Sequence, residues 1–188
     1  MSFDDQLTFS DHTAKTVSSC MSNLAQINRT KQAFDTTVSL ETYFLQAFDK
    51  DLLITIIKGL VSSKMFYCSS VWSNTSVTNI NKLQTIQNFA ALIVTRSRKF
   101  DHITPILKQL CWMPVKDHLF YGDALSTFKC MNGMALTNLC SRFIKRGTIS
   151  GRSTHNENKL DVPRYKTTTG RRSFLYRTVT IGTTCLEI

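Results

Sequence analysis

Apolar residues recur every three or four positions over two long stretches of this chain, and this spacing constrains the fold more than any other feature. In residues 51–61 they are Leu52, Leu53, Ile56, Ile57, Leu60 and Val61, and in residues 77–93 they are Val77, Ile80, Leu83, Ile86, Ala90 and Ile93. Such spacing puts the side chains on one face of an α-helix. We therefore predict helices over residues 51–72 and 76–95, packed together through Ile56, Leu60, Leu83, Ala90 and Ile93.

Further helix signals lie on both sides of this pair. Ser10 or Asp11 can cap a helix over residues 10–34, whose predicted apolar stripe is Ala14, Val17, Met21 and Leu24. Pro105 and Pro114 are predicted to open two more helices, the second of which stops at Gly133, and a short helix follows over residues 136–145. No helical run alternates with strand patterns. The predicted class is mainly α, a helical bundle of about five to seven helices with an irregular basic C-terminal tail.

The predicted domain division follows the change in pattern after residue 146. Residues 1–146 form a helical domain, and residues 147–188 form a basic, irregular tail in which residues 174–181 could make a short strand. From Arg142 onward the chain has ten basic and three acidic residues, which is most of its formal net charge of +10. Such a charge favours a polyanionic partner, nucleic acid before membrane. A solvated tail that binds nothing is the alternative interpretation.

Six cysteines lack the spacing of a metal site. No pair is a CxxC motif and no histidine follows at zinc-finger distance, so we predict free thiols, buried at Cys68, Cys111 and Cys130. The first ten residues contain no apolar run of a signal peptide, and no uncharged apolar run approaches the ~18 residues of a membrane span. We expect an intracellular protein, nuclear or cytoplasmic, without a membrane partner.

Two carboxylate-containing motifs have the residue types of a catalytic site but lack the necessary partners. Asp4 and Asp5 follow an aromatic residue, as do the magnesium-binding carboxylates of polymerase palms, but no strand and no third carboxylate accompany them. Asp101 and His102 could be an acid–base pair, but no nucleophile or metal ligand accompanies them, so a capping aspartate and a structural histidine are expected. The sequence thus predicts no catalytic residue, no cofactor or metal site and no small-molecule substrate.

Basic and aromatic residues alternate near the C-terminus. The motifs are RYK at residues 164–166 and GRRSFLYR at residues 170–177. Arginine and lysine suit a phosphate backbone and aromatic rings suit unpaired bases. The predicted nucleic-acid-binding residues are Arg164, Lys166, Arg171, Arg172 and Arg177. In the competing interpretation, Phe174 and Tyr176 pack against the helices while the arginines face water.

Four pieces of residues 60–135 resemble one family in their order and spacing. They are MFYCSSVW (65–72), NINKLQTIQNFAALIV (79–94), FDHITPILKQLCWMPVKDHL (100–119) and FKCMNGMA (128–135). Together they resemble the region after the polymerase palm in reverse transcriptases of non-LTR retrotransposons, the jockey-like LINE elements. The resemblance extends from Phe3 to about Val179.

The resemblance implies an RNA-directed DNA polymerase whose thumb and post-polymerase region grip an RNA and DNA template–primer duplex. The fingers and the magnesium-binding palm would lie upstream, so this fragment is predicted to be inactive alone. Departures from the family pattern, such as Leu92 for an arginine and Leu136 for a proline, indicate a degenerate copy. Residues 36–46 look inserted, although an extra surface helix would explain them equally well. The alternative function is a stand-alone helical protein–protein interaction module derived from element sequence.

Overall fold

The computed structural model describes residues 7–37, 50–150 and 157–185, without the side chains of 34–37, 150, 184 and 185. Helices account for 71% of it and the described residues contain no strand, which confirms the predicted mainly α class. Six helices have seven or more residues, and several short ones bring the number above the predicted five to seven. None of the helices in these ranges is long and apolar enough to cross a membrane. Asp4, Asp5 and most of the apparent insertion lie outside the described residues.

The chain forms two compact units. Among the described residues, the first comprises 8–37, 50–68 and 75–116, and the second comprises Leu7, Ser69–Asn74, 117–150 and 157–185. This division reflects only which residues lie close together, and it does not test a boundary between a helical domain and a basic tail. The division after residue 146 that the charge pattern predicts therefore stays a prediction.

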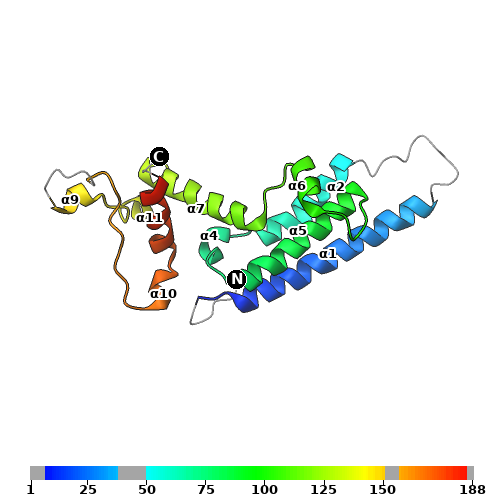
Figure 1. The fold of residues 1–188 in the computed structure, drawn as a ribbon, viewed down its shortest axis with the longest axis horizontal. Helices are drawn as coiled ribbons and strands as arrows, with labels where there is room; N and C mark the ends of the chain where they lie inside the picture. Colours follow the sequence, from blue (N-terminus) through cyan, green and yellow to red (C-terminus); the bar gives the residue numbers. More distant parts are fainter. Residues whose placement is uncertain (1–6, 38–49, 151–156, 186–188) are drawn as a thin grey trace. The chain divides into compact units, whose positions relative to one another are not determined.

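The first unit is built on two long helices that lie side by side (Figure 1), α1 (Ser10–Thr37) and α5 (Val77–Thr95). Three successive segments, α2 (Lys50–Ile57), the π-helix η1 (Lys58–Ser62) and α3 (Ser63–Met65), pack on this pair. Helix α6 (Ile103–Gln109) packs on α5. The core comprises Leu24, Leu53, Ile57, Val61, Met65, Leu83, Ile86, Ala90 and Ala91. The predicted pairing of the two apolar helices is therefore present.

The buried face of α1 differs from the predicted stripe. Thr13, Cys20, Leu24, Ile27 and Lys31 are buried, whereas Ala14 and Met21 are exposed. The buried polar groups bond to backbone carbonyls, since the Thr13 hydroxyl donates to Phe9 O at 2.9 Å and the Lys31 ammonium donates to Ile93 O at 2.7 Å. A buried polar group is tolerated when it is hydrogen-bonded. An apolar pattern alone therefore misplaces this face.

The π-helix η1 changes the face that this segment buries. The Ser63 N–H bonds to Lys58 O, five residues back, so the turn takes up one extra residue. As a result Leu53, Ile57, Val61 and Met65 enter the core, while Leu60 is 48% exposed and Ile56 only half-buried. The predicted packing through Leu60 is wrong for this reason. On the other helix, Leu83, Ala90 and Ile93 are buried as predicted.

Local signals fix both ends of α5, whereas the start of α6 differs from the prediction. The Ser76 hydroxyl accepts from Asn79 N–H at 3.3 Å as the N-cap of α5, and Arg96 ends the helix in a left-handed conformation with φ 54°. Helix α6 begins at Ile103, earlier than the predicted start at Pro105. The Asp101 carboxylate accepts from Arg98 N–H at 2.7 Å in the loop before α6, whereas the N-cap of this helix is His102 without a side-chain cap, so the capping role expected of Asp101 is wrong.

The second unit contains α4 (Ser69–Trp72), most of α7 (Val115–Met131), α8 (Thr137–Cys140), α9 (Arg146–Ser150), α10 (Thr168–Arg171) and α11 (Phe174–Cys185). Helix α7 follows Pro114 and ends as predicted, with Gly133 at φ +68° and the Met134 N–H bonded to Lys129 O at 2.8 Å. Trp72 belongs to the core of this unit and is 1% exposed.

Helix α11 occupies the residues for which the sequence allows a short strand. The threonines and Val179 of this segment favour a strand by local propensity. Tertiary packing decides otherwise, because Val179 is fully buried and the Thr127 hydroxyl of α7 donates to Thr178 O at 3.1 Å. A Cβ at Gly182 would lie 2.8 Å from Leu160 Cδ1 and 2.9 Å from Thr127 Cγ2, so glycine permits this close approach of α11.

The thiols are free at the five cysteines whose side chains are described, but the predicted burial is correct only in part. Cys130 is buried, as is Cys20, whereas Cys68 and Cys111 are exposed. The two exposed cysteines have φ of 49° and 53° and lie where helical segments end. Both residues thus lie at helix ends that face water, which an apolar sequence context does not reveal.

Alkylation of the native protein should separate these thiols into two classes. Cys68 and Cys111 should react quickly, whereas Cys20 and Cys130 should react slowly, since burial restricts access and raises the pKa of both buried thiols, so that less thiolate is present. Peptide mass spectrometry after brief treatment with iodoacetamide measures each site. Equal labelling of Cys20 and Cys68 would contradict the structure, and denatured protein should take up six labels without reductant.

Candidate nucleic-acid interface

Four of the five predicted contact residues lie exposed on one short segment of the second unit. Arg164 and Lys166 precede α10, Arg171 is its last residue and Arg172 is its C-cap. All four side chains are exposed. Arg142, Lys145 and Arg146 of the same unit are exposed too. The described part of this unit therefore presents a concentration of positive charge to solvent.

The backbone of this basic segment, residues 164–172, is shaped by one cap and one glycine. The Thr167 hydroxyl accepts from Gly170 N–H at 3.1 Å and begins α10. A Cβ at Gly170 would lie 2.8 Å from the Tyr165 side chain, so the ring packs directly on this turn. Tyr165 also meets Tyr176 of α11 edge to face, with ring centroids 6.1 Å apart. This aromatic contact fixes Tyr165 between the two exposed cations Arg164 and Lys166.

The aromatic residues therefore serve packing in this structure. Tyr165, Phe174 and Tyr176 are each half-buried, and the edge-to-face pair occupies part of the ring surface. Base stacking needs an exposed ring face. The geometry consequently favours contact with phosphates through the neighbouring cations over stacking of bases on these rings.

Arg177, the fifth predicted contact residue, has its guanidinium inside the second unit. Its Nη2 donates to Ser70 O and to the Ser73 hydroxyl, each at 2.7 Å. Its Nη1 donates to Arg172 O at 2.6 Å, and its Nε lies 3.4 Å from Asp123 Oδ2. The side chain is only 15% exposed. Arg177 thus joins four helical elements, and the geometry assigns it a structural role that competes with the predicted phosphate contact.

Asp123 shares this buried cluster and its charge is poorly compensated. The Ser73 hydroxyl donates to Asp123 Oδ2 at 2.7 Å, whereas Asp123 Oδ1 has no hydrogen-bond partner among the described atoms. Burial raises the pKa of Asp123, and the Ser73 hydrogen bond and the Arg177 charge offset this only in part. Burial likewise lowers the pKa of Arg177 against the pull of Asp123. Both directions indicate that desolvation outweighs the attraction of the pair.

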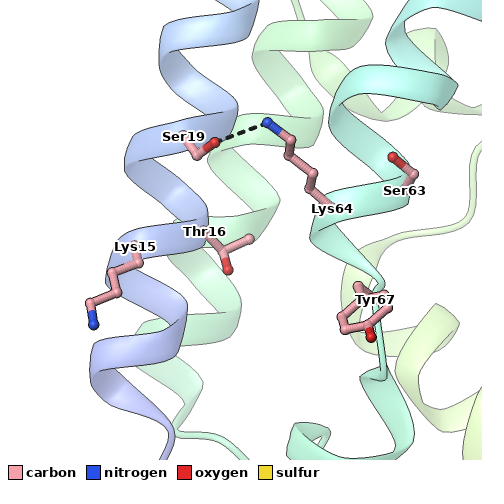
Figure 2. A pocket seen from close by; sticks show the side chains of 6 residues that line it. All are labelled: Lys15, Thr16, Ser19, Ser63, Lys64 and Tyr67. Atoms are coloured by element: carbon pink, nitrogen blue, oxygen red, sulfur yellow. Dashed lines mark hydrogen bonds between the residues drawn. The ribbon is translucent and has the colours of Figure 1, made fainter. Parts of the chain in front are cut away.

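A further group of polar side chains, which the sequence did not single out, surrounds a depression of about 450 Å³ in the first unit. Lys15, Thr16 and Ser19 come from α1, Ser63 and Lys64 from α3, and Tyr67 from the turn that follows (Figure 2). The two contributing segments are more than forty residues apart in the chain. No spacing rule brings them together, so only the packing of α1 on α3 reveals the site.

No group of three or more potential metal ligands occurs in the part of the chain that the structure describes. The predicted absence of a cofactor stays a prediction, since Asp4 and Asp5 are not described. His118 is half-buried, and burial lowers the pKa of its imidazole, so a neutral structural histidine fits this position. Comparisons with protein-family models, with curated proteins and with solved structures gave no match to this chain.

Proposed function

We propose that this chain is a fragment of an RNA-directed DNA polymerase of a non-LTR retrotransposon, from the region that follows the catalytic palm, and that it binds RNA and DNA backbones without sequence preference. The observation that carries the proposal is the resemblance of four ordered sequence pieces in residues 60–135. The mainly α fold is compatible with a thumb-like region. The exposure of Arg164, Lys166, Arg171 and Arg172 supports the backbone contact.

The mode of binding follows from which groups are available. The exposed cations are flexible side chains on a short segment, and the neighbouring tyrosines are engaged in packing. Such an arrangement offers charge to phosphates and few fixed donors or acceptors to base edges. We therefore expect strong dependence on salt and weak dependence on sequence.

Gel mobility shift with an RNA–DNA hybrid tests the proposal. Binding should weaken steeply as the salt concentration increases, because each phosphate that the protein neutralises releases a condensed counterion. Two hybrids of unrelated sequence should bind with similar affinity. Absence of a shift at low salt would overturn the proposal.

Replacing Arg171 and Arg172 with alanine should weaken binding to both hybrids equally. It should also flatten the plot of log affinity against log salt by roughly 0.7–0.9 units for each phosphate that is no longer neutralised. The matched control replaces Lys82 and Lys108, two exposed lysines of the first unit, and removes the same charge. If the control flattens the plot as much, the net charge binds the hybrid and the basic segment has no particular role.

One observation favours the alternative, a helical protein–protein interaction module. Tyr121, Leu125 and Phe128 of α7 recur at helical spacing and are 54%, 38% and 57% exposed. Apolar side chains gathered on one exposed face are typical of interaction surfaces. Two results together would favour this function. The wild-type protein would bind neither hybrid at low salt, and it would self-associate or bind a partner through these three residues.

A further inference from the structure

Two lysines and four residues with hydroxyl groups line the depression between α1 and α3 in the first unit (Figure 2). Lys64 of α3 reaches across to α1, where its ammonium lies 3.2 Å from the Ser19 hydroxyl. Figure 2 shows Thr16 and Tyr67 on either side of the same opening, and Lys15 at its edge with its ammonium directed away from the other side chains. Hydroxyl and ammonium groups are the usual ligands of phosphate oxygens.

Several of these donors have unused capacity. The Lys64 ammonium has three hydrogens, of which one is engaged with Ser19. Ser19 accepts that bond, so its own hydroxyl hydrogen stays available. Within the described ranges, neither the Lys15 ammonium nor the Thr16 hydroxyl makes a hydrogen bond. The Ser63 hydroxyl donates to Gly59 O and therefore offers only lone pairs.

The charge of the depression is one-sided. No acidic residue is among the described residues that line it. The nearest acid along α1 is Asp11, one turn before Lys15, and it lies outside the lining. In the described part of the chain neither lysine forms an ion pair. Two cations beside hydroxyl donors, without a lining carboxylate, attract an anion and repel a cation.

The π-helix fixes the width of the opening. Asn23 of α1 donates from Nδ2 to Leu60 O at 3.0 Å, and the Cys20 thiol lies 3.7 Å from Val61 O. Both carbonyls belong to η1. These bonds tie α1 to the segment just before Lys64. The donors on the two helices are thus held at a set separation.

We propose that this depression binds a phosphate group, with the Lys64 ammonium and the Ser19 and Thr16 hydroxyls as its donors. The phosphate can belong to a nucleic-acid backbone or to a free phosphate or pyrophosphate anion. The shared chemistry is a tetrahedral oxyanion of one or more negative charges. The site lies in the first unit, and it does not depend on the basic segment or on the function proposed for it.

Protection of lysines in the full-length chain tests the site. The protein is treated with an amine-acylating reagent in pyrophosphate and in sodium chloride of the same ionic strength, and each lysine is quantified by peptide mass spectrometry. Lys64 should be acylated more slowly in pyrophosphate, whereas the exposed control Lys82 should react at the same rate in both. Equal slowing of the two lysines would show a general salt effect and would overturn the proposal.

Calorimetric titration with pyrophosphate provides a second measurement. Lys64→Met should weaken binding about tenfold or more, the effect of losing one charge-assisted hydrogen bond. Ser19→Ala should weaken it less, because the donor it removes is neutral, and Lys82→Met should bind as the wild type does. Because Lys64 is exposed, its replacement leaves the core intact. Unchanged affinity of Lys64→Met would overturn the proposal.

A short oligothymidylate without terminal phosphate identifies the source of the phosphate. Protection of Lys64 by the oligonucleotide alone assigns a backbone phosphodiester, and protection by pyrophosphate alone assigns a free anion. Protection by both supports the common site, and protection by neither overturns it. Failure of the hybrid to bind the basic segment would leave the pyrophosphate result unaffected, so the two proposals fail separately.

Discussion

Ile57→Ala should lower the free energy of unfolding of the first unit by about 2–5 kcal/mol, the usual cost of truncating a fully buried isoleucine. Leu60→Ala, three residues later, should cost clearly less, about 1 kcal/mol, because nearly half of Leu60 is exposed and its truncation removes less buried apolar surface. An unbroken α-helix with the apolar stripe of the sequence would bury Leu60 instead. The two substitutions therefore measure whether η1 places Ile57, and not Leu60, in the core in solution.

The two tryptophans allow each unit to be followed separately. Trp112 belongs to the first unit and Trp72 to the second, so urea unfolding of a Trp72→Phe variant reports on the first unit through Trp112 fluorescence. Both alanine substitutions are made in this background, which serves as the reference. A larger loss for Leu60→Ala than for Ile57→Ala would show that the π-helix is absent.

Arg177→Met should destabilise the second unit by about 3–5 kcal/mol, because it leaves the Asp123 carboxylate buried without its cation. The Ser70 and Arg172 carbonyls also lose a hydrogen bond, although Asn74 Nδ2 still donates to Arg172 O at 2.9 Å. Unfolding in urea, followed through Trp72 in a Trp112→Phe background, measures the change. Arg171→Met is the matched control, since Arg171 is exposed and should alter stability by less than about 0.5 kcal/mol.

A second variant separates the ion pair from the loss of packing. Arg177→Met combined with Asp123→Leu removes both charges, and this double variant should regain part of the stability that Arg177→Met loses. Equal stability of Arg177→Met and Arg171→Met would refute the structural role of Arg177. In that event its guanidinium would be available for phosphate, as the sequence pattern alone predicts.

Charge linkage adds a pH dependence to this cluster. Because burial raises the pKa of Asp123, the folded protein keeps this proton to higher pH than the unfolded chain does. The contribution of Asp123 to stability is therefore fully present below its ordinary pKa and is lost as the pH rises through the raised value. Asp123→Asn should abolish this component of the pH profile.

The helical class and several helix ends follow from the sequence alone. The apolar periodicity of residues 77–93, the Ser76 cap and the stop at Gly133 are local signals, and local backbone chemistry realises them directly. The apolar stripes of α5 and of the preceding helical segment also predicted that the two pack together, because each stripe needs a partner surface to bury it. The exposure of Arg164, Lys166, Arg171 and Arg172 agrees with the strong bias of arginine and lysine side chains toward solvent.

Tertiary structure decided the features that depend on distant partners. The π-helix moved Leu60 out of the core, and Asn23 and Cys20 of α1 bond to two carbonyls of this segment. Packing against Thr127 and Leu160 made a helix of residues whose propensity favours a strand. Arg177 became structural through groups more than fifty residues away, and Lys64 meets Ser19 across a similar interval. A one-dimensional pattern reports which side chains share a helix face, whereas hydrogen bonds and close contacts between distant segments exist only once the chain has folded.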